Sequence, residues 1–266
     1  MRQTRKSDWL FHFYLVIFLI YLIGPLVIMG GAAFNDSRFP SVYPWVGWTG
    51  KWFVELWNDS RMWVAFRNTI GIAVAVVAIS VPIGTAAAIL INSLAGGTRS
   101  LLYGLMVAPI LTPGAVIGIS TLLFWNTFGV PAGLHLAVLG QVSYIAAFVM
   151  LLVLARLQSF DRGLEEAALD LGASHGQVLR RILLPHLYPA IGAGAAIGFF
   201  QSIENFNVTL FTRGTSDTLT VYVFSKVRTG ITPTINALAL ILIAVTLLLA
   251  LVYEIFRRRR ARKDVG

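Results

Sequence analysis

The chain has 266 residues, of which 57% are hydrophobic and 12% are charged, with a mean hydropathy of +0.75. This composition excludes an ordinary soluble domain and predicts an all-α, polytopic membrane protein. The chain has no cysteine, which excludes disulfides and thiolate metal sites.

Six stretches are apolar over the roughly 20 residues that a membrane span requires. We predict spans near 9–34, 63–93, 101–126, 135–157, 189–211 and 234–256. Several are longer than a bilayer needs, so tilting or breaks are expected. The first run continues well past the length of a signal-peptide core, which favours a retained helix over a cleaved signal.

The net charge of +9 suggests nucleic-acid binding until the basic residues are placed on these spans. If the amino terminus is inside, fourteen of the 21 Lys and Arg residues fall in cytoplasmic segments. The other seven fall outside: Arg38, Lys51, Arg61, Arg67, Arg213, Lys226 and Arg228. This bias follows the positive-inside rule and predicts cytoplasmic termini, with no nucleic-acid partner. The Arg257–Arg260 run fits an anchor against anionic lipid.

The first outer loop, about 35–62, is rich in tryptophan, with Trp45, Trp48, Trp52 and Trp57. Tryptophan at this density predicts a short helix in the interfacial belt of the membrane. Two roles stay open for it, membrane anchoring and docking of a receptor.

The third span contains Pro109 and Pro113, four residues apart. Each proline removes a backbone donor, so the helix should kink or break there. A broken helix at membrane depth requires protein or a watery cavity around its freed backbone groups. These prolines therefore line a substrate pathway or form a purely structural kink.

A polar insert lies between the fourth and fifth spans. Asp161 can cap a helix that runs to about residue 171 and ends at Gly172. Ser174 and Gln177 have the spacing of a capping box for a second helix, which Pro185 should end. The insert is thus predicted to be a cytoplasmic hairpin of two short helices.

The insert reads Glu166-Ala167-Ala168, three residues, Gly172, nine residues, Ile182, one residue, then Leu184-Pro185. This resembles the EAA loop of binding-protein-dependent ABC importer permeases. A DNA-binding helix-turn-helix would need a basic helix clear of the membrane, whereas a solvated connector is a serious alternative. The resemblance implies that loop 159–188 docks an ATPase subunit through these residues: Glu165, Glu166, Ala167, Ala168, Gly172, Ala173, Ile182, Leu184 and Pro185.

Further matches spread over most of the chain. Ser37-Arg38-Phe39, Lys51-Trp52, Asp59 and the segment 229–238 resemble the second permease subunit of spermidine/putrescine importers. The resemblance implies one permease domain over 1–266, a type I ABC importer permease fold and a bacterial inner-membrane location. It also implies the following partners: a homologous permease, two ATPase subunits that bind ATP and Mg²⁺, a periplasmic receptor and a small solute.

Glu204 is a carboxylate inside the fifth predicted span, where an ionised side chain costs about 3 kcal/mol even on lenient scales. We expect it to face the substrate pathway or to pair with a neighbouring span. At helical spacing Gln201 and Glu204 share a face with Asn205 and Val208, whereas Phe206 points elsewhere. The candidate pathway residues are Glu204, Gln201, Asn205, Asn207, Pro109 and Pro113.

Polyamine permeases resemble this region but carry an adjacent acidic pair where this chain has Glu204-Asn205. The loss of one counter-charge leaves a polyamine and a mono-cationic or zwitterionic amine open as the solute. His12, His135, His175 and His186 show no paired ligand spacing, so we expect no metal site. The chain has no Gly-rich nucleotide loop, so it needs a partner for ATP hydrolysis and is not itself an enzyme. The alternative is a secondary transporter that works without an ATPase.

Overall fold

The computed structural model describes residues 4–230 and 232–263. Residues 1–3, Ile231 and residues 264–266 lie outside the described part. Ile231 belongs to the segment 229–238 noted above, and the side chains of Arg257–Arg260 also lie outside the described part. The described chain is helical and has no strand beyond one isolated bridge between Asn35 and Trp48. The helices are α1 (Thr4–Phe34), α2 (Lys51–Asn58), α3 (Ser60–Ser93), α4 (Gly96–Leu111), α5 (Gly114–Asn126), α6 (Leu134–Leu157), α7 (Arg162–Asp170), α8 (His175–Val178), the π-helical turn η1 (Leu179–Leu183), α9 (Leu184–Ile203), α10 (Asn207–Thr212), α11 (Leu219–Thr229) and α12 (Thr234–Lys263).

Two compact units make up the chain. Residues 1–62 and 223–266 form one unit, and residues 63–222 form the other. In the first unit, α12 packs against both α1 and α2. The apolar side chains of α1 are largely exposed within the chain, as expected of a helix that faces lipid or a partner.

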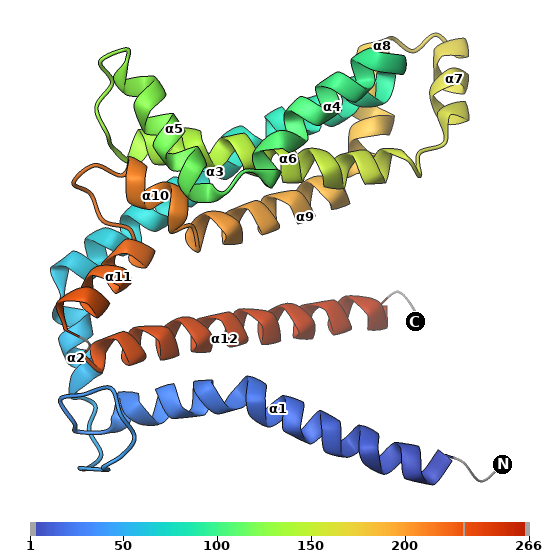
Figure 1. The fold of residues 1–266 in the computed structure, drawn as a ribbon. Helices are drawn as coiled ribbons and strands as arrows, with labels where there is room; N and C mark the ends of the chain where they lie inside the picture. Colours follow the sequence, from blue (N-terminus) through green and yellow to red (C-terminus); the bar gives the residue numbers. More distant parts are fainter. Residues whose placement is uncertain (1–3, 231, 264–266) are drawn as a thin grey trace. The chain divides into compact units, whose positions relative to one another are not determined.

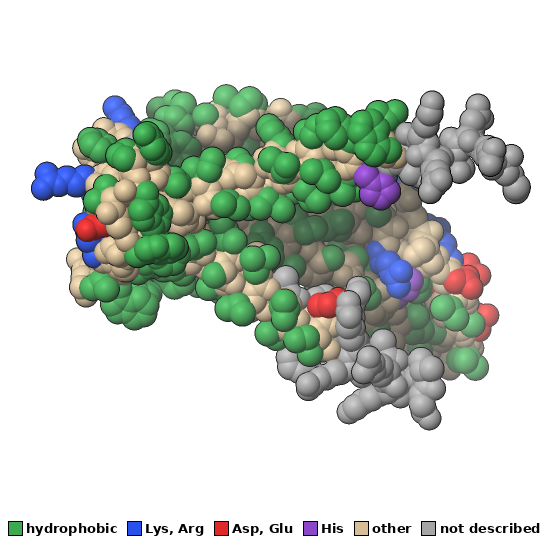
Figure 2. All heavy atoms as spheres, turned by 90° about the horizontal axis from the view of Figure 1, so that it is seen from below, with side chains coloured by type: hydrophobic (Ala, Val, Ile, Leu, Met, Phe, Trp, Pro, Cys, Tyr) green, Lys and Arg blue, Asp and Glu red, His purple; other side chains and the backbone are tan. Residues whose placement is uncertain are grey.

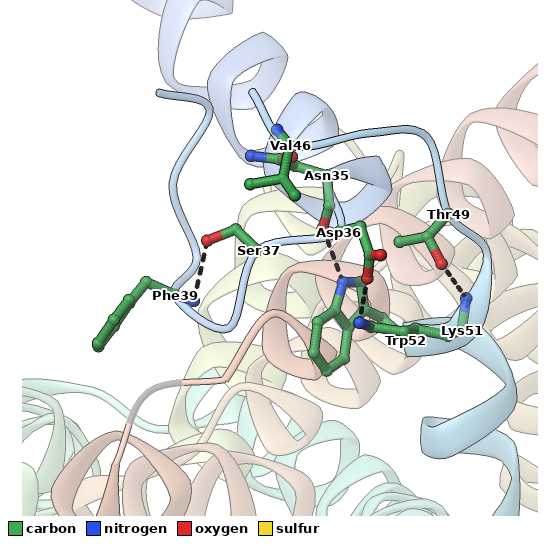
Figure 3. A network of polar contacts seen from close by, with 8 residues as sticks. All are labelled: Asn35, Asp36, Ser37, Phe39, Val46, Thr49, Lys51 and Trp52. Carbon is green, nitrogen blue, oxygen red and sulfur yellow. Dashed lines mark hydrogen bonds and ion pairs between the residues drawn. The ribbon is translucent and has the colours of Figure 1, made fainter. Parts of the chain in front are cut away.

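The connection between α1 and α2 folds around the buried side chain of Asn35 (Figure 3). Its Nδ2 donates to the carbonyl oxygens of Ser41 at 2.9 Å and Pro44 at 3.0 Å, and its Oδ1 accepts from the N–H of Val46 at 2.8 Å. The indole N–H of Trp52 donates to the Asn35 carbonyl oxygen at 2.9 Å. One asparagine therefore holds a loop that has no other regular structure.

The predicted Trp-rich helix exists as α2, but it differs from the expectation in its contacts. Trp45 and Trp48 precede α2, and Trp52 within it is only 7% exposed. The buried indole N–H of Trp52 has a backbone acceptor inside the unit, so this side chain packs within the protein. The interfacial position of the helix stays a prediction. Trp48 and Trp57 remain exposed.

The second unit is built around α6, which is buried over most of its length. A cluster of buried side chains joins α6 to α3 and α9: Ala88, Ile91, Val149, Met150, Val153, Leu154, Leu157 and Leu187. These side chains are aliphatic, and small residues on α9 bring it close to α6. Helices α3, α6 and α9 are therefore closely packed and form the core of this unit.

Four helical stretches in the described residues are long and apolar enough to cross a membrane: Trp9–Phe34, Ser60–Ser93, Leu134–Leu157 and His175–Ile203. The pair α4 and α5 is bent by 106° and adds a fifth if counted as one span. Thr234–Leu248 is a shorter apolar helix. Figure 2 shows many hydrophobic side chains and few charged ones on the face in view. The six-span count and the cytoplasmic termini stay predictions.

The break expected in the third span is confirmed. Helix α4 ends at Leu111 and α5 begins at Gly114, with the bend between them at Thr112 and Pro113. Pro113 is the N-cap of α5, a position where its missing N–H costs nothing.

The fifth span differs from the prediction at both ends. Pro185 does not end a helix, because the chain continues from α8 through η1 into α9. In η1 the Leu184 N–H bonds to the carbonyl oxygen of Leu179, and this wider turn admits Pro185 at the start of α9. At the other end the helix stops at Ile203, and α10 begins only at Asn207. The bounds 189–211 predicted for this span are therefore wrong, since the apolar helical stretch runs from His175 to Ile203.

Candidate functional site

The polar insert begins with α7, whose first turn is capped as predicted. Asp161 Oδ1 accepts a hydrogen bond from the Gly163 N–H at 2.9 Å. Glu165 lies in the first turn, where a carboxylate is favoured by the positive end of the helix dipole. The cap predicted from the sequence is therefore present at the start of α7.

The other end of α7 is closed by a Schellman motif. The Ala173 N–H bonds to the Ala168 carbonyl oxygen at 3.0 Å, and the Gly172 N–H bonds to the Leu169 carbonyl oxygen at 2.9 Å. Gly172 has a φ of +86°, which an L-residue with a Cβ adopts only at a cost. The capping box on α8 is also present, with Ser174 and Gln177 each bonding to the other's backbone. Both predicted caps are confirmed.

The insert is fixed to the transmembrane helices at its base. Arg156 Nε donates to the His186 carbonyl oxygen at 3.2 Å, and His186 Nε2 lies 3.3 Å from the Arg156 carbonyl oxygen. The ring of Phe160 lies 5.2 Å from that of His186. These contacts join the end of α6 to the start of α9.

A groove of about 450 Å³ lies between α7 and the carboxyl end of α3. Glu165 and Glu166 line it together with Arg162, Asn92 and Ser93. No described residue forms a hydrogen bond or ion pair with either glutamate side chain. The groove therefore presents two carboxylates that are available to an incoming group.

The predicted docking residues separate into three kinds. Ala168, Gly172 and Ala173 form the helix end, whereas Glu166, Ala167 and Pro185 are exposed at the surface. Ile182 of η1 and Leu184, the first residue of α9, are half-buried.

Sequence reasoning missed Leu171 and Leu164, which are 90% and 54% exposed. An apolar side chain next to the predicted helix stop was the available signal for Leu171. A leucine this exposed at the tip of a polar insert fits a surface that a partner covers.

The second candidate site is a cavity of about 410 Å³ in the same unit, where two broken helices meet. The break between α4 and α5 forms one side, and the break between α9 and α10 forms the other (Figure 1). A Cβ on Gly118 of α5 would lie 2.9 Å from the Val208 carbonyl oxygen, so only glycine permits this approach of α10. Broken helices that meet in this way form the substrate sites of many transporters.

The wall of the cavity combines polar and aromatic side chains. The full lining is Pro109, Ile110, Thr112, Gly114, Ile117, Tyr144, Phe148, Gln201, Glu204, Asn205, Phe206, Asn207 and Val208. Glu204 is the one ionisable carboxylate among them, and it is exposed to the cavity at the C-cap of α9. No described residue forms a hydrogen bond or ion pair with it.

Asn205 holds the break in place through several hydrogen bonds. Its Oδ1 accepts from the N–H groups of Val208 at 3.1 Å and Thr209 at 3.2 Å, and its Nδ2 donates to the Tyr144 hydroxyl at 2.8 Å. The Thr220 hydroxyl donates to the Asn205 carbonyl oxygen at 3.2 Å. Asn205 therefore caps α10 as well as lining the cavity.

A buried amide lies behind the break. Gln141 of α6 is fully buried, donates to the Thr209 hydroxyl at 2.9 Å and accepts from the Ser202 hydroxyl at 2.6 Å. The Thr209 hydroxyl in turn donates to Asn205 Oδ1 at 3.2 Å. A network with this many satisfied members gives α6, α9 and α10 a single arrangement.

Five of the six predicted pathway residues line this cavity: Glu204, Gln201, Asn205, Asn207 and Pro109. Pro113 does not, since it caps α5 behind the bend. The expected helical face is wrong at Phe206, because the helix ends before Glu204 and Phe206 also lines the cavity. Val208 is fully buried and lies in the cavity wall with Gln201, Glu204 and Asn205.

Sequence reasoning did not identify Tyr144, Phe148 or Gln141 as residues of this site. The residues that they meet here lie about sixty positions away in the sequence. A polar Gln141 within an apolar span was the signal that could have found the network. No group of three His, Cys, Asp or Glu residues able to hold a metal occurs in the described part of the chain.

Comparison with known proteins bears on both sites. A family model described as "binding-protein-dependent transport system inner membrane component" matches residues 80–262, which include the insert and the cavity. The spermidine/putrescine transport system permease protein PotC of Escherichia coli (strain K12) is 30% identical over 247 residues, covering 92% of this chain and 93% of that protein. The putrescine transport system permease protein PotI of the same organism is 32% identical over 246 residues, covering 90% and 86%.

Solved structures agree on the fold. A bacterial ABC transporter involved in the import of the acidic polysaccharide alginate has a chain that matches with a TM-score of 0.75 and 22% identity, over 96% of both chains. An amino acid ABC transporter matches with a TM-score of 0.59 and 20% identity, over 78% of this chain and 98% of that one. The predicted type I importer permease fold is thereby confirmed.

The family model covers most of the chain, and the PotC and PotI matches bear out the resemblance to polyamine-type permeases. The chain belongs to the family of binding-protein-dependent transport system inner membrane components, the permease subunits of ABC importers.

Proposed function

We propose that this chain is the second permease subunit of an importer that moves a small cationic amine into the bacterial cytoplasm. The solute would be a polyamine such as putrescine or spermidine, or a related amine or amino-acid-like compound. The names of the PotC and PotI relatives support this substrate class, and both matches extend over nearly the whole chain.

In this proposal the chain works as one permease domain over residues 1–266, passing several times through the inner membrane. It pairs with a homologous permease, two ATPase subunits that bind ATP and Mg²⁺, and a periplasmic receptor. A solved neighbour of this fold is an alginate transporter in complex with its substrate-bound periplasmic protein, which supports the receptor.

Glu204 is the observation that carries the amine assignment. Its carboxylate faces a cavity between two broken helices, and no described side chain neutralises it. It also lies at the carboxyl end of α9, where the helix dipole adds further negative potential. Tyr144, Phe148 and Phe206 complete a wall that suits a cation through their ring faces. The positive charge of an ammonium group would balance the negative charge of the Glu204 carboxylate.

The docking insert would couple this cavity to the ATPase subunits. Arg156 and His186 bond across the base of the insert, and η1 and α9 run without a break from it to Gln201 at the cavity. A displacement of α7 by an ATPase subunit would therefore reach the break at Glu204 through a continuous helix.

The test is ATP-dependent uptake of radiolabelled putrescine and spermidine by proteoliposomes that contain the complete importer and its receptor. Glu204→Gln should lower uptake at least tenfold and leave co-purification of the other subunits unchanged, since about 1.4 kcal/mol corresponds to a factor of ten. Glu55→Gln makes the same chemical change at an exposed site on α2 and should transport normally. Uptake at the wild-type rate by the Glu204→Gln variant would contradict a role for Glu204 in the substrate pathway.

The same preparation separates the importer from a secondary transporter. Vesicles that lack the ATPase subunits, or that lack ATP, should take up no solute. Uptake by the permeases alone would contradict the assignment of a motor.

A further inference from the structure

The orientation of the Asn205 amide is fixed by its neighbours. Its Oδ1 accepts hydrogen bonds from the backbone N–H groups of Val208 and Thr209, at 3.1 and 3.2 Å. A backbone N–H can only donate, so the atom that receives both must be the amide oxygen and not the nitrogen. The Nδ2 group of Asn205 is therefore the atom that faces Tyr144, at 2.8 Å from its hydroxyl oxygen.

This orientation sets the polarity of the Tyr144 hydroxyl. The amide nitrogen has no lone pair to offer, so the phenol oxygen accepts this bond and its own proton is left to donate elsewhere. No acceptor for that proton is found among the residues that the structure describes. Because Tyr144 lines the cavity, its O–H group is available to a molecule inside it.

The cavity therefore offers two different groups to a solute. Glu204 presents a negative acceptor that suits an ammonium, and Tyr144 presents a donor that suits an oxygen. A diamine carries only donors in its protonated form, so it offers no acceptor for the Tyr144 proton. A solute with an ammonium at one end and a carboxylate or carbonyl oxygen at the other satisfies both groups.

We propose that Tyr144 is a specificity-determining residue that donates a hydrogen bond to an oxygen of the solute, and that Asn205 positions it as a donor. The solute class is then an amine that also carries an oxygen acceptor, such as an ω-amino acid. This inference rests on the proposed role of Glu204 and narrows the substrate class of the same cavity.

Asn205→Asp replaces the amide with a carboxylate. An aspartate keeps one oxygen toward the Val208 and Thr209 N–H groups, so the cap on α10 is retained. Its second oxygen replaces Nδ2 and accepts the proton of Tyr144, whose lone pairs then face the cavity. The same substitution adds a second carboxylate beside Glu204. Both changes favour a diamine over an amino acid.

The experiment measures solute binding to the membrane complex of permeases and ATPase subunits in nanodiscs, without the receptor, so that the receptor's own selectivity does not enter. The probes are 4-aminobutanoate and 1,4-diaminobutane, which match in length and differ at one end. Saturation-transfer difference NMR with increasing solute gives a Kd for each probe. The ratio of the two Kd values is the quantity of interest, because a purely structural defect would weaken both.

Wild type should bind 4-aminobutanoate more tightly than 1,4-diaminobutane. Tyr144→Phe should weaken 4-aminobutanoate about tenfold, the value of one hydrogen bond to a charged group, and should not weaken the diamine. Asn205→Asp should reverse the preference. Tyr188→Phe removes the hydroxyl of an exposed tyrosine on α9 and should leave both Kd values unchanged.

The possible failures are distinguishable. If Glu204→Gln weakens both probes while Tyr144→Phe and Asn205→Asp leave the Kd ratio at its wild-type value, the role of Tyr144 is overturned and the amine pathway stands. If Glu204→Gln changes neither probe, the cavity is not an amine site and the proposed function loses its main support.

Discussion

The backbone N–H of Ala173 donates to the carbonyl oxygen of Ala168 at 3.0 Å and closes the end of helix α7. In this closure Ala168 is the third residue from the helix end and Gly172 is the first residue beyond the cap. The fixed spacing from Ala168 to Gly172 in the insert is thus a requirement of backbone geometry. The alanines on either side keep the end narrow, and the surface presented to a partner is formed by other residues.

Gly172→Ala should weaken the hold on the ATPase subunits. A Cβ at a φ of +86° costs about 1–2 kcal/mol, and no neighbouring atom compensates for it. The loop should lose its fixed closure, and the fraction of permease that co-purifies with the ATPase should fall. Gly176→Ala is a matched control, because Gly176 also has open space around it but a φ outside the left-handed region. Equal losses in the two variants would contradict the closure argument.

Leu171 should contribute to the same interaction by direct contact. It is 90% exposed, so Leu171→Ser should leave the thermal stability of the isolated permease unchanged while lowering ATPase retention. Burial of a leucine side chain is worth about 1.5–3 kcal/mol, which corresponds to a loss of affinity of roughly tenfold or more. Leu171→Met keeps the apolar volume and should retain near-normal binding. Retention of the ATPase by the Ser variant would exclude Leu171 from the interface.

Gly118→Ala should destabilise the second unit. The added Cβ would lie 2.9 Å from the Val208 carbonyl oxygen and 3.1 Å from its Cα, so backbone must move. Overpacking of this kind costs about 1–3 kcal/mol and should lower the thermal midpoint of the detergent-solubilised complex. Gly104→Ala on α4 has open space around its Cβ and should not lower the midpoint. A normal midpoint in Gly118→Ala would mean that α5 and α10 are not in close contact.

Local chemistry made parts of this fold predictable. Pro109 and Pro113 act on their own neighbours, so the break between α4 and α5 is readable without tertiary information. The same holds for Asp161 and Ser174, whose side chains cap helices within three residues of themselves.

The break at Glu204 was not readable in this way. No proline or glycine marks it, and the Asn205 side chain that caps α10 at Val208 and Thr209 also bonds to Tyr144, which is 61 positions away. Tyr144 was not predicted to line the cavity because Asn205, to which it bonds, is distant in the sequence. At Pro185 the local signal was present but was overridden, because the π-helical turn before it lets the helix continue.

Asn35→Ala should loosen the loop that follows α1. The substitution removes the amide that bonds to Pro44 and Val46, and a buried group left unpaired costs about 1–3 kcal/mol. The expected result is faster tryptic cleavage after the exposed Arg38 in reconstituted vesicles, because cleavage requires local opening. Thr49→Ala removes a single exposed hydrogen bond of the same loop and should be cleaved at the wild-type rate. If Asn35→Ala is cleaved no faster than Thr49→Ala, the buried amide does not hold the loop.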